Sequence, residues 1–288
     1  MDISRKRKTV FLQEGYQMPG NYAHHAERKP PLIEFENVTI VRDGCRALNA
    51  VTLSLQEGEN VAILGPNGAG KSSFVKAISR EYYPVISEDT VTFRFRGNDV
   101  WDVFELRSFI GIVSNDLQYT FTRTITGHEV VLSGFFSSIG LFNRDITLAM
   151  EEKAEEIEQL LGIRKLSSRP MTSLSSGEAR RFLIGRALVP GPATLLLDEP
   201  TSSLDLSALH TFRNTLRKIA QAGTSIVLVT HNLHDIIPEI TRVILMKDGK
   251  IVGDGEKTAM LTNEQIGSLF SVPVSVREEH GWYYATGF

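Results

Sequence analysis

The chain contains the stretch Val61-Ala62-Ile63-Leu64-Gly65-Pro66-Asn67-Gly68-Ala69-Gly70-Lys71-Ser72-Ser73. An apolar strand pattern runs into a glycine-rich loop, and the loop matches the P-loop pattern G-x-x-x-x-G-K-[ST] in full. Gly68 and Gly70 have no Cβ, so the backbone passes close to phosphate oxygens and its N–H groups point at them. Lys71 adds a point charge for the β- and γ-phosphates, and Ser72 supplies a hydroxyl ligand for Mg²⁺. The stretch therefore predicts a strand, a phosphate-binding loop and a helix, in that order.

The composition is that of an ordinary globular protein. The chain has 288 residues, of which 42% are hydrophobic and 23% charged, and its net charge is −3. Nucleic-acid binding surfaces carry an excess of basic residues, so we expect no nucleic-acid partner. Cys45 is the single cysteine, which excludes an internal disulfide and suits a reducing cytoplasm. The sequence has no window of about 20 apolar residues, so we do not expect it to span a membrane.

Residues 1–31 are predicted to form a flexible N-terminal arm. They contain glycines, prolines and the basic cluster Arg5–Lys8, with little periodicity. No apolar stretch follows the basic cluster, so it is not a secretory signal. A solvated tail is favoured over contact with anionic lipid or nucleic acid, because so short a basic cluster is weak evidence for either.

The rest of the chain alternates between strand and helix patterns. The strand candidates are Leu32–Val41, Val51–Gln56, Val61–Leu64, Val91–Phe95, Phe109–Val113, Thr194–Asp198, Ser225–Thr230 and Arg242–Met246, and Lys71–Arg80 is the helix after the P-loop. Residues 124–173 are helical in character, as in the apolar stripe of Glu151–Leu161. We therefore predict an α/β fold with a mostly parallel sheet, helices on both faces and a helical insertion. Residues 256–288 predict two short helices and small strands around Val274 and Tyr283.

A second acidic element follows another buried strand pattern. The apolar run Leu195–Leu197 ends in Asp198 and Glu199. Asp198 is a candidate ligand for Mg²⁺, directly or through water, and Glu199 is placed to polarise an attacking water molecule. This pattern is weak alone, but it becomes specific when a P-loop precedes it in the chain.

Further motifs resemble those of the ATP-binding cassette (ABC) ATPases. One, Leu174-Ser175-Ser176-Gly177-Glu178, resembles the family's signature sequence, usually Leu-Ser-Gly-Gly-Gln. The others are Ser202-Ser203-Leu204-Asp205, similar to its D-loop, and Thr230-His231, similar to its switch histidine at a strand end. The resemblance covers about Leu32 to Gly255. It implies a P-loop NTPase with an N-terminal antiparallel β subdomain and an inserted α-helical subdomain at residues 32–255, followed by a C-terminal extension at 256–288.

The resemblance also implies a mechanism. Two such domains bind head to tail and sandwich two ATP molecules, each held by the P-loop of one chain and the signature of the other. Ser175 and the N–H of Gly177 would reach the γ-phosphate across the interface. Glu199 would orient the attacking water, and His231 would contact the γ-phosphate. The partner is a second copy of this chain or a second ABC subunit.

Three departures from the family pattern leave roles open. Ser176 and Glu178 replace the usual Gly and Gln of the signature. Arg42 stands where the family often places an aromatic residue that stacks on adenine; its guanidinium could stack in the same way or point to solvent. After the Phe109–Val113 strand, Asn115 occupies the place of the family's Mg²⁺-sensing glutamine. Gln118 follows three residues later. We favour Gln118, which has the family's residue type and the longer reach.

The expected function is ATP hydrolysis to ADP and phosphate with Mg²⁺, as the cytoplasmic energy-coupling subunit of an ABC transporter. A separate permease would hold the chain peripherally at the inner face of the membrane, on a groove between the Asn115–Gln118 loop and the helical insertion. Val113–Gln118 and Leu132–Phe136 resemble single-cassette importers. The alternative is a soluble non-transport ABC ATPase in repair, translation or regulation. A kinase or GTPase is disfavoured by Leu174–Glu178 and by the lack of an Asn-Lys-x-Asp run.

Overall fold

A parallel sheet forms the centre of the computed structural model, which describes residues 29–85, 90–114, 125–202 and 204–287. Among these residues the sheet has six strands in the order β5-β6-β7-β3-β8-β9. They are β3 (Val61–Leu64), β5 (Ile110–Val113), β6 (Thr194–Asp198), β7 (Ser225–Thr230), β8 (Arg242–Lys247) and β9 (Lys250–Glu256). Strand β9 runs antiparallel to β8, and the other neighbours are parallel. The predicted α/β fold with a mostly parallel sheet is confirmed.

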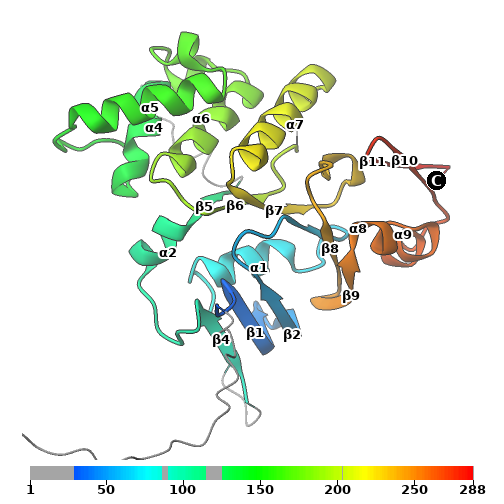
Figure 1. Cartoon of the computed structure of the whole chain (residues 1–288). Helices are drawn as coiled ribbons and strands as arrows, with labels where there is room; N and C mark the ends of the chain where they lie inside the picture. Colours follow the sequence, from blue (N-terminus) through cyan, green and yellow to red (C-terminus); the bar gives the residue numbers. More distant parts are fainter. Residues whose placement is uncertain (1–28, 86–89, 115–124, 203, 288) are drawn as a thin grey trace, which may run out of the picture.

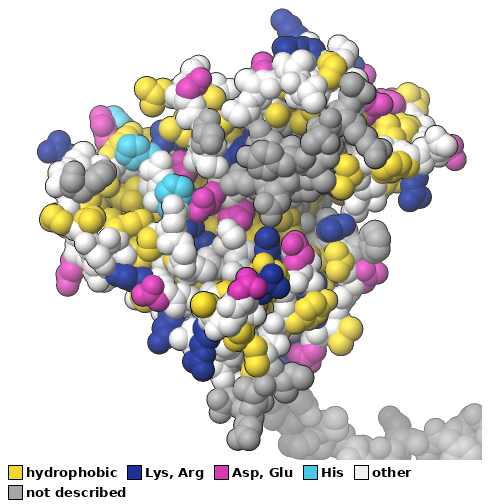
Figure 2. All heavy atoms as spheres, turned by 180° about the vertical axis from the view of Figure 1, so that it is seen from behind, with side chains coloured by type: hydrophobic (Ala, Val, Ile, Leu, Met, Phe, Trp, Pro, Cys, Tyr) yellow, Lys and Arg dark blue, Asp and Glu magenta, His cyan; other side chains and the backbone are white. Residues whose placement is uncertain are grey.

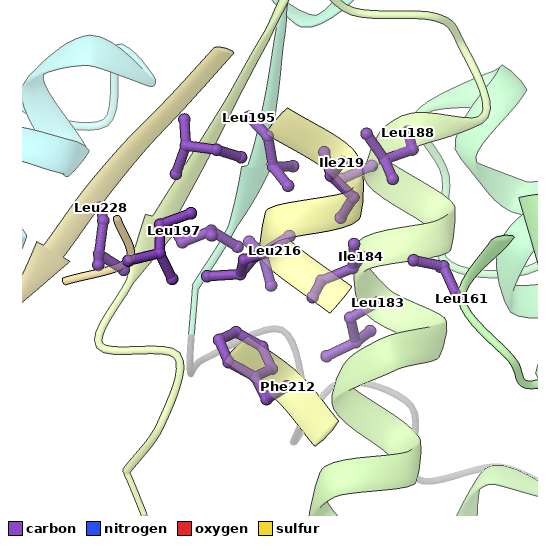
Figure 3. Close-up of a cluster of buried hydrophobic side chains, with 14 of the residues drawn as sticks. Leu161, Leu183, Ile184, Leu188, Leu195, Leu197, Phe212, Leu216, Ile219 and Leu228 are labelled. Carbon is purple, nitrogen blue, oxygen red and sulfur yellow. The ribbon is translucent and has the colours of Figure 1, made fainter. Parts of the chain in front are cut away.

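The central strands are buried on both faces, which explains their continuous apolar sequences. Successive side chains of a strand point to opposite faces. Leu195 and Leu197 of β6 accordingly pack into one hydrophobic cluster, together with side chains of helices α6 (Ser176–Leu188) and α7 (Leu206–Gln221) (Figure 3). Leu196 packs into the second cluster, on the other side of the sheet. This packing fixes β6, and with it the polar residues that follow its carboxyl end.

A smaller antiparallel sheet lies on the second cluster, in the strand order β2-β1-β4. Its strands are β1 (Ile33–Arg42), β2 (Cys45–Leu55) and β4 (Thr92–Phe95). Asp43 and Gly44 join β1 to β2 with φ of +49° and +78°, the conformation that a two-residue hairpin turn requires. The sequence predicted the second strand only from Val51 onward. It begins at Cys45, because pairing with β1 extends it through a stretch in which Arg46 and Asn49 interrupt the apolar pattern.

The remaining described elements surround the central sheet. They are α1 (Lys71–Ile78), α2 (Val103–Phe109), α4 (Gly127–Ser133), α5 (Leu148–Leu160), α8 (Lys257–Met260), α9 (Asn263–Phe270), the short 3₁₀ turns η1 (Gly134–Phe136), η2 (Arg164–Leu166), η3 (Met171–Ser173) and η4 (Leu233–Asp235), and the hairpin β10 (Ser275–Glu279) and β11 (Trp282–Thr286). Helices α4, α5 and α6 gather at one end of the molecule, and the antiparallel sheet lies at the opposite end (Figure 1). Helices α4 and α5 fall within the predicted insertion. The division into arm, ATPase domain and extension stays a prediction, and residues 1–28 of the arm lie outside the described residues.

The surface carries charges of both signs. On the described part of the face seen in Figure 2, Lys and Arg side chains lie interspersed with Asp and Glu side chains. This distribution is in keeping with the net charge of −3. The absence of a nucleic-acid partner stays a prediction. No helix in the described part of the chain combines the length and the apolar character that a membrane crossing requires.

A partly buried ionic network joins α4 to α5. His128 Nδ1 lies 2.7 Å from Glu158 Oε1, and His128 Nε2 lies 2.7 Å from Glu151 Oε2. Glu158 is fully buried and also accepts hydrogen bonds from Ser167 and Arg164. The hydrogen bond to Glu158 is the main reason why the pKa of His128 rises to about 9. Burial opposes this rise, and the hydrogen bond to Glu151 adds to it. His128 is therefore a cation at neutral pH.

We expect His128→Gln to lower the free energy of unfolding at neutral pH by about 1 kcal/mol, after allowance for partial exposure to solvent, and so to lower the melting temperature. The folded-state pKa lies above the ordinary 6.5, so the protonated ring stabilises the fold fully below pH 6.5, and this contribution is lost as pH rises through about 9. Thermal unfolding of both proteins across this range should show the difference shrinking at high pH. Lys153→Gln, which breaks the exposed pair with Glu156, is the control. A difference for His128→Gln that is independent of pH would contradict the ionic origin.

Candidate functional site

The P-loop lies at the carboxyl end of β3, and its glycines are required by geometry. Gly68 and Gly70 have φ of +81° and +97°, in the left-handed region, and Gly70 is the N-cap of α1. A Cβ added to Gly65 would lie 2.1 Å from the Met246 carbonyl oxygen, and one added to Gly70 would lie 2.4 Å from that of Ala47. A Cβ on Gly68 would meet no protein atom within 4 Å. The loop is therefore packed tightly on its inner side and open at Gly68, on the side where a phosphate would enter.

The side chain of Lys71 lies across this loop and is only 4% exposed. Its Nζ donates hydrogen bonds of 2.9 Å to the carbonyl oxygens of both Gly65 and Pro66. The same atom lies 3.2 Å from Glu199 Oε1. Ser72, one residue on, is exposed at the first turn of α1. The other predicted loop residues are the exposed Asn67, the buried Ala69 and the partly buried Ser73.

Glu199 is held in a strained turn directly after β6. Its φ is +46°, a conformation that a non-glycine residue adopts only when its surroundings hold it there. The backbone N–H of Glu199 donates a 2.8 Å hydrogen bond to the carbonyl oxygen of Val229 on β7, and Arg180 Nη1 donates one of 3.1 Å to the Glu199 carbonyl oxygen. Asp198, the last residue of β6, is 9% exposed. This turn aims the Glu199 carboxylate back over the sheet, toward the P-loop.

His231 completes the group at the end of β7. Its side chain is 42% exposed, and its Nδ1 lies 3.3 Å from Glu199 Oε1. In the strand order β6-β7-β3, the residues after the three parallel strands emerge at the same edge of the sheet. Lys71, Glu199 and His231 therefore meet at one carboxylate oxygen, beside the P-loop. A carboxylate beside a phosphate cradle is suited to orient and deprotonate water, and the neighbouring Lys and His side chains are suited to stabilise negative charge on a phosphoryl group.

The signature residues lie elsewhere, at the N-terminus of α6. The Ser175 hydroxyl accepts a hydrogen bond from the Glu178 N–H, and Glu178 Oε2 accepts one of 2.8 Å from the Ser175 N–H. This reciprocal capping box explains a Glu at position 178. The hydrogen bond from the Ser175 backbone is the main cause that lowers the pKa of Glu178. The family's glutamine in this place is thus replaced by an ionised residue that caps the same helix.

The D-loop residue Asp205 lies beside the signature. Asp205 is the N-cap of α7, and its Oδ1 accepts a 2.7 Å hydrogen bond from the Ala208 N–H. A Cβ on Gly177 would lie 3.0 Å from the Ala208 side chain, so the first turns of α6 and α7 pack closely there. The N-termini of α6 and α7 border a pocket of about 240 Å³. Of the described residues that line it, Ser175, Gly177 and Glu178 belong to the signature and Asp205 belongs to the D-loop, whereas none belongs to the P-loop. Leu174 and Ser176 flank Ser175 and are partly buried.

Arg42 makes a contact within the protein that the sequence did not predict. Its Cζ lies 4.6 Å from the centre of the Tyr82 ring, so the guanidinium stacks on a ring of the protein itself. Tyr82 follows α1, and no spacing in the sequence indicated this contact. The stacking of Arg42 on adenine stays a prediction. Asn115 and Gln118 lie outside the described residues, and the choice between them stays open.

Comparisons with known proteins agree with these motifs. The model of the ABC transporter family matches residues 48–202. The chain is 33% identical over 248 residues to YlmA of Bacillus subtilis, an ABC transporter ATP-binding protein described as uncharacterized, covering 85% of this chain and 93% of that protein. It is 31% identical over 262 residues to the hemin import ATP-binding protein HmuV of Bradyrhizobium diazoefficiens, with 88% and 93% covered.

A solved structure extends the similarity to the fold. The ATP-binding cassette MJ0796, in a dimeric post-hydrolysis state bound to ADP and Pi, has a TM-score of 0.62 and 27% identity, with 78% of this chain and 98% of that chain covered. The expected family is therefore confirmed, since its model matches more than half of the chain and its members share about a third of their residues with it. This chain belongs to the ABC transporter family, as an ATP-binding subunit that hydrolyses ATP.

Proposed function

We propose that this chain powers an importer, working as a head-to-tail pair with Mg²⁺ and ATP on a separate permease at the cytoplasmic face of a membrane. The observation that supports this most is the split of the site within one chain. Lys71, Glu199 and His231 converge at the P-loop, whereas Ser175 faces its own pocket with Asp205. A second copy, turned head to tail, would bring its signature to the nucleotide on the first.

The donor atoms near the P-loop fit Mg²⁺. The Ser72 hydroxyl and the Asp198 carboxylate are hard oxygen donors, and Mg²⁺ in nucleotide sites is usually held by one or two protein oxygens together with the phosphates. We assign these two residues to the metal, with Gln118 preferred over Asn115 as a further contact. When bound, Mg²⁺ neutralises charge that develops on the transferred phosphoryl group.

The remaining residues act on ATP and water. Within the P-loop, Gly65–Ser73, free backbone N–H groups and the ammonium of Lys71 bind the β- and γ-phosphates. Glu199 orients a water molecule and accepts its proton as the oxygen attacks the γ-phosphorus and the bond to the β-phosphate oxygen breaks. His231 donates to the γ-phosphate, and Arg42, on its Tyr82 platform, stacks on the adenine. The products are ADP and inorganic phosphate.

The transport role is supported by a groove between the sheet and the helical end of the molecule. It has a volume of about 310 Å³, and its walls include Arg107, Arg186 and the exposed Ile139. Burial lowers the pKa of Arg186 to about 10, and Arg107 adds to this effect. The walls also carry Lys76, Glu81 and Asp198, so the groove offers charged groups of both signs beside apolar side chains such as Ile139 to a permease segment. The import direction rests on the similarity to the hemin import protein HmuV.

We expect Ile139→Glu to abolish retention on inside-out membrane vesicles of the source organism, because it places a charge at an apolar position of the groove. Sedimentation of tagged protein with the vesicles measures this. Val252→Glu, an equally exposed apolar position on β9, is the matched control, and thermal unfolding checks that both variants fold. If wild-type protein is not retained, the soluble non-transport alternative is favoured. If Ile139→Glu is retained like wild type, the groove is not the docking site.

A further inference from the structure

A buried carboxylate lies close behind the catalytic residues without belonging to them. Asp235 ends η4, four residues after His231, and is only 2% exposed. Its Oδ2 accepts a 2.5 Å hydrogen bond from the Thr230 hydroxyl and a 2.6 Å hydrogen bond from the Thr201 hydroxyl. One oxygen atom therefore joins two segments that are far apart in the sequence.

Both threonines are neighbours of proposed catalytic residues. Thr230 is the last residue of β7 and directly precedes His231. Its hydroxyl also accepts a 3.0 Å hydrogen bond from the Asn232 N–H, so it bridges the two sides of His231. Thr201 lies two residues after Glu199, in the turn that gives Glu199 its positive φ. Asp235 thus ties the turn that carries Glu199 to the turn that carries His231.

Burial of the Asp235 carboxylate destabilises the folded state unless the charge is compensated. Burial raises the pKa of Asp235, and the hydrogen bonds from Thr201 and Thr230 and the charges of Arg213 and His231 oppose that shift. A buried carboxylate is destabilising unless its hydrogen bonds are made, so the two hydroxyls are held firmly once it is ionised. A neutral side chain would fill the same space at lower cost. The hydrogen bonds of Asp235 join the segments at the carboxyl ends of β6 and β7, where Glu199 and His231 lie, and this placement indicates a role at the site.

We propose that Asp235 is a positioning residue of the ATPase site, which holds the Glu199 carboxylate and the His231 imidazole at their separation of 3.3 Å. The inference rests on the roles of Glu199 and His231 in the proposed function. Asp235 is buried and is therefore not placed to contact ATP or the attacking water itself. It acts through Thr201 and Thr230, by fixing the two turns relative to each other.

The test compares hydrolysis with nucleotide binding. Asp235→Ala, Thr201→Val and Thr230→Val should each lower kcat about tenfold or more, which corresponds to about 1.4 kcal/mol of barrier. Affinity for a fluorescent ATP analogue should stay within about twofold, because no hydrogen bond of Asp235 reaches the P-loop side chains. Thr201→Ser keeps the hydroxyl and should restore kcat. Asp235→Ala combined with Thr201→Val should be no slower than Asp235→Ala alone, because both remove the same tie.

The chain offers a matched control in the same two strands. Thr194 and Ser225 begin β6 and β7, and their buried hydroxyls form a 2.9 Å hydrogen bond at the opposite edge of the sheet. Thr194→Val should lower the melting temperature like Thr201→Val and leave kcat unchanged. If Thr201→Val is destabilised but keeps wild-type kcat, Asp235 is merely structural and the inference is wrong. It is also wrong if ATP affinity falls together with kcat. Failure of the proposed function is distinct, because then Glu199→Gln would hydrolyse ATP like wild type.

Discussion

Glu199→Gln should abolish ATP hydrolysis and leave ATP binding intact. The amide cannot accept a proton from water, and loss of a general base costs roughly 10²–10⁴-fold in rate. The Gln oxygen still accepts hydrogen bonds at the place where Glu199 Oε1 now faces Lys71 and His231, so the loop should keep its shape. Without the negative charge near the γ-phosphate, the ATP-bound pair of chains should accumulate. Release of inorganic phosphate and titration with a fluorescent ATP analogue measure the two properties separately.

The control is the same Glu-to-Gln substitution at a carboxylate outside the ATPase site. Glu34 on β1 is partly exposed and lies 3.8 Å from Arg94, away from the P-loop. Glu34→Gln should hydrolyse ATP at the wild-type rate. If Glu199→Gln also keeps a near wild-type rate, Glu199 does not orient the attacking water, and the convergence of Lys71 and His231 on it has only a structural meaning.

The strands that the sequence predicted best are those in which every residue is buried. For β3, β6 and β7, the predicted and observed bounds coincide, because continuous apolar runs end sharply at glycine or polar residues. The same runs located the P-loop, Glu199 and His231, which directly follow these strands. Parallel pairing then brought the three together without any further signal in the sequence.

The parts that were not predicted depend on contacts between distant residues. Strand β9 contains Gly253 and Gly255 and alternates exposed and half-buried residues, so it has no apolar run. It forms because it pairs with β8, where Arg242 makes a salt bridge to Asp254. The tie between Asp235 and Thr201 spans 34 residues in the same way. Contacts between residues so far apart produce no local sequence pattern. The burial of the Asp235 carboxylate was therefore not predictable from the sequence.

The second large effect concerns the completion of each ATP site by another chain. Lys71→Ala removes a charge-assisted contact to phosphate and should weaken ATP binding by tenfold or more, since such contacts are worth about 1.5–3 kcal/mol. Ser175→Arg places a bulky side chain at the N-terminus of α6, where Ser175 is exposed, and should block its approach to a partner's nucleotide. At ATP concentrations well below the weakened Kd, each variant alone should be nearly inactive, because both sites of its homodimer carry the defect.

Mixing the two variants gives the most direct measurement of this composite site. Random pairing makes about half of the dimers mixed, and each mixed dimer contains one site with an intact Lys71 and an intact Ser175, so about a quarter of the sites should recover. Phosphate release by the mixture should then approach a quarter of the wild-type rate, if the sites act independently. A mixture that releases no more phosphate than the sum of the two inactive variants would show that each chain completes its own site, and would contradict the head-to-tail arrangement.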